Sequence, residues 1–136
     1  MLPLSRTTNP SDLLAFVVRI LGGLPLLVIG ISHVVWSGAA MQPLVEAMGL
    51  PMPGLLAPLA VAAEIGAGLS MLLGYRTRIG ALLAVGTMAV AFYSHLAIEA
   101  WPNPQEPPIA LPLILLACGA FLLWRGSGRW SLDARA

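Results

Sequence analysis

The sequence predicts an all-α integral membrane protein, a bundle of four transmembrane helices that forms a single membrane domain over residues 1–136. Two observations carry this prediction. The chain is 58% hydrophobic and only 10% charged, whereas about a quarter of the residues in soluble domains are charged. The apolar residues also fall into four blocks, separated by short connections that are rich in proline or contain arginine.

Each block is long enough to be considered a membrane span, because about 20 apolar residues cross the hydrocarbon core. Backbone groups in lipid must be paired within the span, so each should be helical. The expected spans are residues 13–36, 54–73, 77–98 and 108–124. Tryptophan, which favours membrane interfaces, lies at or near their ends: Trp36, Trp101, Trp124 and Trp130.

Arginines in the connections predict the orientation. They precede the first span, occupy the turn at Arg76 and Arg78, and follow the fourth span. Because loops rich in basic residues stay in the cytoplasm, we expect both termini and this turn to be cytoplasmic. The loop with Glu46, which should hold a short interfacial helix, and the proline-rich loop around residues 100–108 would face outward.

Small residues at helical spacing predict which faces pack together, since membrane helices associate through close packing of such residues. Every ionisable group within a span lies on one of these stripes, which predicts a polar interior rather than contact with lipid. The stripes are Arg19, Gly23, Leu26, Gly30 and His33 in the first span, Ala60, Glu64 and Gly68 in the second, and Gly80, Ala84, Thr87, Ala91 and His95 in the third.

Depth along the helices suggests which of these groups meet. At about 1.5 Å per residue, Arg19 and Glu64 lie roughly 9 and 13 Å from the cytoplasmic ends of their spans. We therefore expect an ion pair between them. Such a pair serves either as a path for protons or substrate or as a lock on helix register, and the sequence leaves both open.

His33 and His95 come out level with each other, roughly 27 to 30 Å from the cytoplasmic side. Glu99 follows His95 by one turn, and Glu106 lies in the neighbouring rigid loop. We expect these groups to line a polar cavity near the outer face. Imidazoles there could transfer protons, hydrogen-bond a quinone carbonyl or bind a metal. As metal ligands, His33, His95 and Glu99 are a weak signature beside a zinc motif.

Several function classes leave no trace in the sequence. The net charge of +1 and the lack of a basic run exclude a nucleic-acid partner. The single cysteine, Cys118, excludes an intramolecular disulfide. Walker, Rossmann, haem-attachment and nucleophile-elbow motifs are all absent from the sequence. It therefore gives no sign of a self-sufficient enzyme, although a subunit of an oxidoreductase complex remains open.

These features together resemble the DoxX family of small four-helix bacterial membrane proteins. The resemblance rests on Arg19 and the segment 30–33, the turn at 49–51, Glu64 with Gly68, the segment 74–81, and Met88 with Ala91. It implies a multi-pass location in the bacterial cytoplasmic membrane and a role in an electron-transfer or thiol-handling assembly. The positions it carries over are Arg19, His33, Glu64, Arg78 and His95.

Three functions thus remain as hypotheses. The first is a redox-complex subunit or partner that binds quinone or another oxidoreductase at the outer cavity. The second is a small proton-coupled transporter or ligand-binding bundle, and the third is a purely structural assembly subunit. The sequence identifies no cofactor, and it favours quinone over a metal. Partners would be the lipid bilayer and either copies of the chain or subunits of a redox complex.

Overall fold

The structure, a computed structural model, describes residues 9–35, 38–99 and 108–135, and side chains 38–40 are outside the description. Within these ranges it contains five α-helices and no strand, which confirms the all-α prediction. The helices are α1 (Pro10–Val35), α2 (Gly38–Ala47), α3 (Pro53–Leu73), α4 (Thr77–Ala97) and α5 (Ala110–Arg125).

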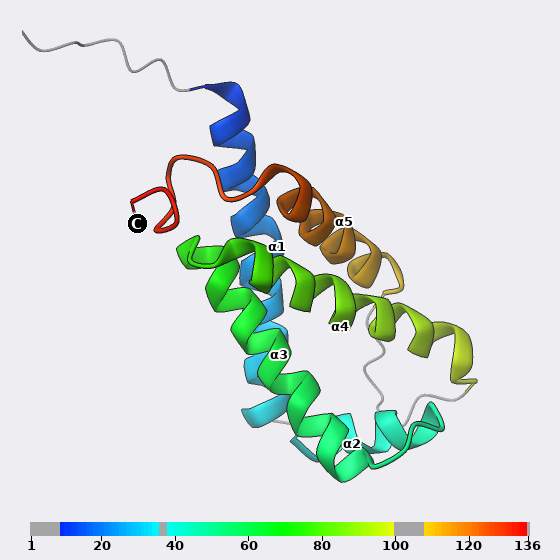
Figure 1. Ribbon diagram of the computed structural model, residues 1–136. Helices are drawn as coiled ribbons and strands as arrows, with labels where there is room; N and C mark the ends of the chain where they lie inside the picture. Colours follow the sequence, from blue (N-terminus) through cyan, green and yellow to red (C-terminus); the bar gives the residue numbers. More distant parts are fainter. Residues whose placement is uncertain (1–8, 36–37, 100–107, 136) are drawn as a thin grey trace, which may run out of the picture.

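Four of the helices form a bundle (Figure 1). Helices α3 and α5 each pack against both α1 and α4, so α1 lies diagonally across from α4, and α3 from α5. The start of α1, the α3–α4 turn and the segment after α5 gather at one end, which we call the terminal end. The short helix α2 packs against α1 and α3 at the opposite end (Figure 1).

Three helices, α1, α3 and α4, are long and apolar enough to cross a membrane, while α5 is shorter at 16 residues. Their large apolar side chains point outward, as Leu21, Leu59 and Leu82 do. The interior combines small residues and a few polar ones with a small set of large apolar side chains, chiefly Leu26, Met71, Leu115 and Leu122. This distribution suits lipid as the solvent, because lipid tails solvate large apolar side chains well and leave small residues for helix contacts.

Helices α1 and α3 approach backbone to backbone at their glycines. A Cβ added to Gly68 would lie 2.7 Å from the backbone nitrogen of Leu27, and one added to Gly23 would lie 3.0 Å from the carbonyl oxygen of Gly68. Neither position has room for a side chain. The small-residue stripe expected in α1 is therefore a contact face, and Arg19, Gly23, Leu26 and Gly30 are all buried on it.

The helix boundaries differ from the expected spans by a few residues. Helix α1 begins earlier, at Pro10, α4 ends at Ala97, and α5 begins later, at Ala110. The short helix predicted in the first long connection is present as α2, and its buried Met41 and Val45 pack against α3. Trp36 and Trp101 lie outside the described residues.

Candidate functional site

Arg19 is buried at the terminal end, with 2% of its surface exposed. Its Nε donates to the carbonyl of Met71 at 2.8 Å, and Nη2 donates to the carbonyl of Leu72 at 2.9 Å. Nη1 donates to the carbonyls of Ser127 and Trp130, at 3.2 and 2.7 Å. The guanidinium thus joins α1, the end of α3 and the C-terminal tail, residues 126–135.

These contacts complete the hydrogen bonding at the end of α3. The last four carbonyls of a helix have no partner within it. Here the N–H groups of Gly74 and Tyr75 donate back into the final turn, Arg19 donates to two of the carbonyls, and Leu132 of the tail donates to Leu73. Gly74 has φ 65°, and a Cβ there would lie 2.8 Å from Cζ of Arg19. Glycine is therefore needed for the turn and for the arginine beside it.

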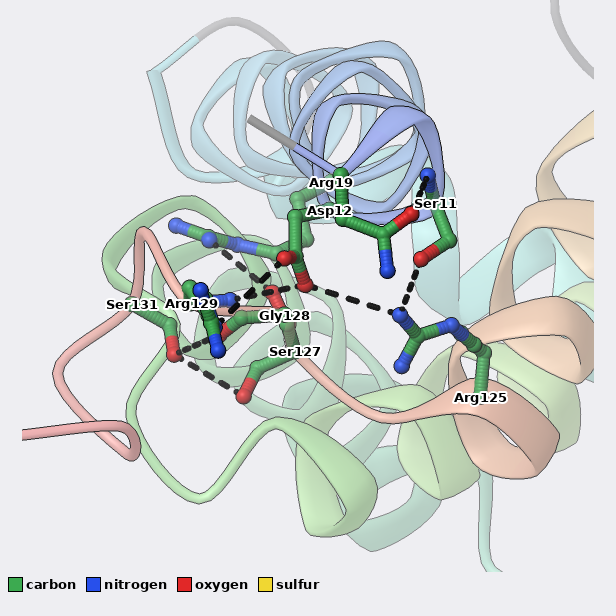
Figure 2. Close-up of polar contacts among 9 residues, drawn as sticks. Ser11, Asp12, Arg19, Arg125, Ser127, Gly128, Arg129 and Ser131 are labelled. Carbon is green, nitrogen blue, oxygen red and sulfur yellow. Dashed lines mark hydrogen bonds and ion pairs between the residues drawn. The ribbon is translucent and has the colours of Figure 1, made fainter. Parts of the chain in front are cut away.

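Asp12 of α1 also binds the tail, through Arg129 (Figure 2). It is buried in the first turn of α1, where its carboxylate accepts a hydrogen bond from the backbone N–H of Arg129. Arg125 lies 3.5 Å from the same carboxylate and donates to the hydroxyl of Ser11 at 2.7 Å. Tail and α1 are thus held together by charge as well as by backbone contacts.

Asp133 of the tail caps α4. The backbone N–H groups of Arg76 and Thr77 donate to its two carboxylate oxygens at 2.6 and 2.9 Å. Burial raises the pKa of this carboxyl, but these N–H donors and the positive charge of Arg19 outweigh burial and hold the pKa below its usual value. Helix α4 has no capping hydrogen bond from its own N-cap side chain, Arg76, so the tail supplies the acceptor.

The predicted ion pair between Arg19 and Glu64 is wrong, because each has other partners. Helical side chains lean toward the N-terminus of their own helix. Since α1 and α3 are antiparallel, Arg19 leans toward the terminal end while Glu64 leans away from it. The depths predicted from the rise per residue apply to the backbone and do not include these opposite directions of the two side chains.

The same lean brings His33 and Glu64 together. Nδ1 of His33 lies 3.0 Å from Oε2 of Glu64, although the two residues are 31 positions apart in the chain. Glu64 is 5% exposed, and the side chain of His33 is 22% exposed. Within the described residues the structure gives Nε2 of His33 no hydrogen-bond partner. The pair therefore has one nitrogen available at its partly open side.

The other candidates do not join this pair in the described residues. Nδ1 of His95 contacts the carbonyl of Ala91 one turn back, at 2.9 Å. Glu99 is exposed and lies beyond the end of α4, so it does not continue the helix face of His95 as predicted. Arg78 is exposed in the first turn of α4, and Glu106 lies outside the described residues. Among those residues no group of three metal-ligating side chains occurs.

Sequence reasoning missed Asp12 and Asp133, which hold the tail. A signal for the second existed, since the expected third span begins directly after Arg76, a residue that cannot accept a hydrogen bond from the helix start. That absence predicts an acceptor from elsewhere in the chain. No local pattern could have identified Asp133 as that acceptor, because it lies 57 residues from Arg76.

Comparison with known proteins agrees with the architecture. The family model described as DoxX matches residues 14–97, which run from α1 to the end of α4 and include His33 and Glu64. The chain is 37% identical to the inner membrane protein YqjF of Escherichia coli over 70% of this chain and 71% of that one. It is 31% identical to the uncharacterized membrane protein Rv3486 of Mycobacterium tuberculosis over 87% of this chain and 78% of that one.

No solved structure matches the chain. The family match covers more than half of the sequence, and the relatives are membrane proteins by name. Together with the three long apolar helices, these findings show that the chain is a multi-pass membrane protein and belongs to the DoxX family.

Proposed function

We propose that this protein is a membrane component of a redox assembly, and that His33 and Glu64 form the site at which it binds a quinone head group. The observation that carries the proposal is the 3.0 Å contact between a buried carboxylate and a partly exposed imidazole on the neighbouring helix. Ionisable groups inside membrane bundles are costly and often belong to ligand sites or proton relays.

The chemistry follows from the orientation of the ring. A carboxylate that accepts a hydrogen bond from Nδ1–H fixes the imidazole and leaves Nε2 for a second partner. When protonated, Nε2 donates to a quinone carbonyl; when neutral, it accepts a proton. Reduction of a quinone to a quinol takes up two electrons and two protons. The electrons would come from a partner oxidoreductase, and the pair would pass protons.

Proton-coupled transport is the second candidate. It is favoured by the same burial of Glu64 between helices, because a carboxylate and an imidazole in contact can hand a proton on. The structure removes the form of this hypothesis that relied on Arg19 and Glu64, since Arg19 donates to four backbone carbonyls. A transport path would instead run through His33.

The location and orientation are part of the proposal. The relative YqjF is an inner membrane protein by name, and we propose the same membrane here, with the terminal end in the cytoplasm. Cysteines replacing the exposed Tyr75 and Glu46, each in a Cys118→Ala background, test the orientation. In intact cells an impermeant maleimide should label position 46 and leave position 75 unlabelled; the reverse pattern would overturn it.

Mass spectrometry of protein extracted with its lipids tests the ligand. Wild-type protein should carry quinone, and Glu64→Gln or His33→Gln should lose most of it. Glu46→Gln is the matched control, because Glu46 is an exposed carboxylate that accepts a hydrogen bond from the side chain of Gln42. Equal quinone in all four proteins would refute the assigned site. Proton-coupled flux in liposomes without bound quinone would favour transport, and a larger complex without ligand would favour a structural subunit.

A further inference from the structure

Three exposed arginines surround the α3–α4 turn. Arg76 and Arg78 lie at the start of α4, and Arg135 lies two residues beyond Asp133, which is bonded to the backbone of Arg76. None of the three forms an ion pair with a described residue. We propose that these arginines, which we call the arginine patch, bind the phosphate groups of anionic phospholipids in the leaflet at the terminal end.

The carboxylates at this end cannot neutralise the patch. Six described arginines lie there against two aspartates, Asp12 and Asp133, which leaves a formal excess of four positive charges. Asp12 is buried and faces Arg125 and Arg129. Asp133 is held by two backbone N–H groups and by the charge of Arg19. The outward charge of the patch is therefore wholly positive.

The surroundings of the patch match the edge of a bilayer. Tyr75 is half exposed. The guanidinium of Arg76 lies over the Tyr75 ring, with Cζ 5.7 Å from the ring centroid. Ile79 and Leu82, which follow on α4, are 54% and 61% exposed. Apolar side chains thus continue from the arginines toward the middle of the helix, with an aromatic ring at the boundary, where membrane proteins place such rings.

This arrangement favours a lipid over a soluble anion. A guanidinium binds phosphate oxygens through paired hydrogen bonds, and a phosphate carried by a lipid also places acyl chains against Ile79 and Leu82. Each basic residue near the membrane surface raises the affinity for an anionic lipid, relative to a neutral one, by roughly fivefold. Three such residues give on the order of a hundredfold preference over a neutral lipid.

Native mass spectrometry of protein released from nanodiscs tests the proposal. The discs contain equal amounts of phosphatidylglycerol and phosphatidylcholine. Wild-type protein should retain phosphatidylglycerol in preference, and the triple change of Arg76, Arg78 and Arg135 to Gln should abolish the preference. The same three positions changed to Lys should keep most of it. Arg129→Gln is the matched control, because Arg129 lies beside Asp12, 3.8 Å from its carboxylate.

Each outcome decides the proposal. It is overturned if wild-type protein retains the two lipids equally, or if the triple Gln variant keeps the wild-type preference. It is also overturned if soluble glycerol phosphate displaces the bound lipid, since the site would then recognise a free anion. A preference that falls in high salt, which screens exposed charges, supports it. None of these results depends on quinone binding at His33.

Discussion

Arg19 and Glu64 are both ionisable, both buried in membrane helices and on neighbouring faces of α1 and α3, yet the structure treats them differently. Arg19 donates four hydrogen bonds, all to backbone carbonyls. Among the described residues, the polar partner of Glu64 is His33, which is itself titratable and partly exposed. A guanidinium whose hydrogen bonds all go to backbone carbonyls holds helices together. A carboxylate beside an imidazole instead has a partner to which a proton can pass. Burial alone does not separate a structural charge from a functional one.

The largest effect should come from Arg19→Met. It removes a donor from four backbone carbonyls and loosens the tail. A buried acceptor left without a partner costs about 1 to 3 kcal/mol, and the carbonyls of Leu72, Ser127 and Trp130 are the ones exposed to this loss. Unfolding in detergent, followed by helical circular dichroism, should show this loss. Arg19→Lys keeps the charge but has fewer hydrogen-bond donors, so its stability should lie between those of the wild type and Arg19→Met. A neutral result for Arg19→Met would remove the distinction drawn between the two sites.

Gly68→Ala should come next, because the added Cβ meets the backbone of Leu27 and Gly23, which cannot move aside as a side chain could. Overpacking of this kind costs about 1 to 3 kcal/mol. Gly66→Ala is the matched control, since it lies in the same helix with nothing within 4 Å of its added Cβ. It should be neutral or slightly stabilising. If both variants lost the same amount of stability, the close contact between α1 and α3 at Gly68 would not be the cause of the loss.

Glu64→Gln should destabilise the protein by only about 1 kcal/mol, because a neutral amide can still hydrogen-bond the imidazole. Its stability should therefore stay close to wild type while ligand binding falls. The check is the same detergent unfolding experiment, run beside the quinone measurement. A loss of stability as large as that of Arg19→Met would mean that Glu64 also holds the helices together, and the contrast between the two sites would disappear.

Asp133→Asn should have the smallest effect, about 0.5 kcal/mol, because asparagine also caps helices well. The pH dependence carries more information. Because the folded pKa of Asp133 is depressed, its contribution is fully present above the unfolded value of 3.8 and is lost as pH falls through the folded value. The difference in stability between the wild type and Asp133→Asn, measured by the same unfolding experiment, should therefore be constant above the unfolded value and should narrow as the pH is lowered below it. A difference that stays constant below the unfolded value would contradict the assignment.

The fold was accessible from the sequence because hydropathy and small-residue spacing are local signals. They predicted the helices of the bundle and the buried face of α1. The site was only partly accessible: His33 and Glu64 were identified as candidates, but His33 was grouped with His95 and Glu99, and Glu64 with Arg19. Pairing depends on which way side chains lean and on the relative offset of two helices. Neither can be predicted from the residue spacing within one helix. The contacts between Arg19 and the tail join residues more than 100 positions apart, so no local pattern predicts them either.

The hydrogen bonds of Arg19 to Ser127 and Trp130 also link the first helix to residues that are synthesised more than 100 positions later. The arginine is translated early and its tail partners late, so α1 enters the membrane with a guanidinium whose last two acceptors do not yet exist. Chains build from the N-terminus, so all four acceptors of Arg19 are present only once residue 130 has been added. A stop codon shortly after α5 would leave the five described helices in the sequence and still remove two of the four acceptors of Arg19.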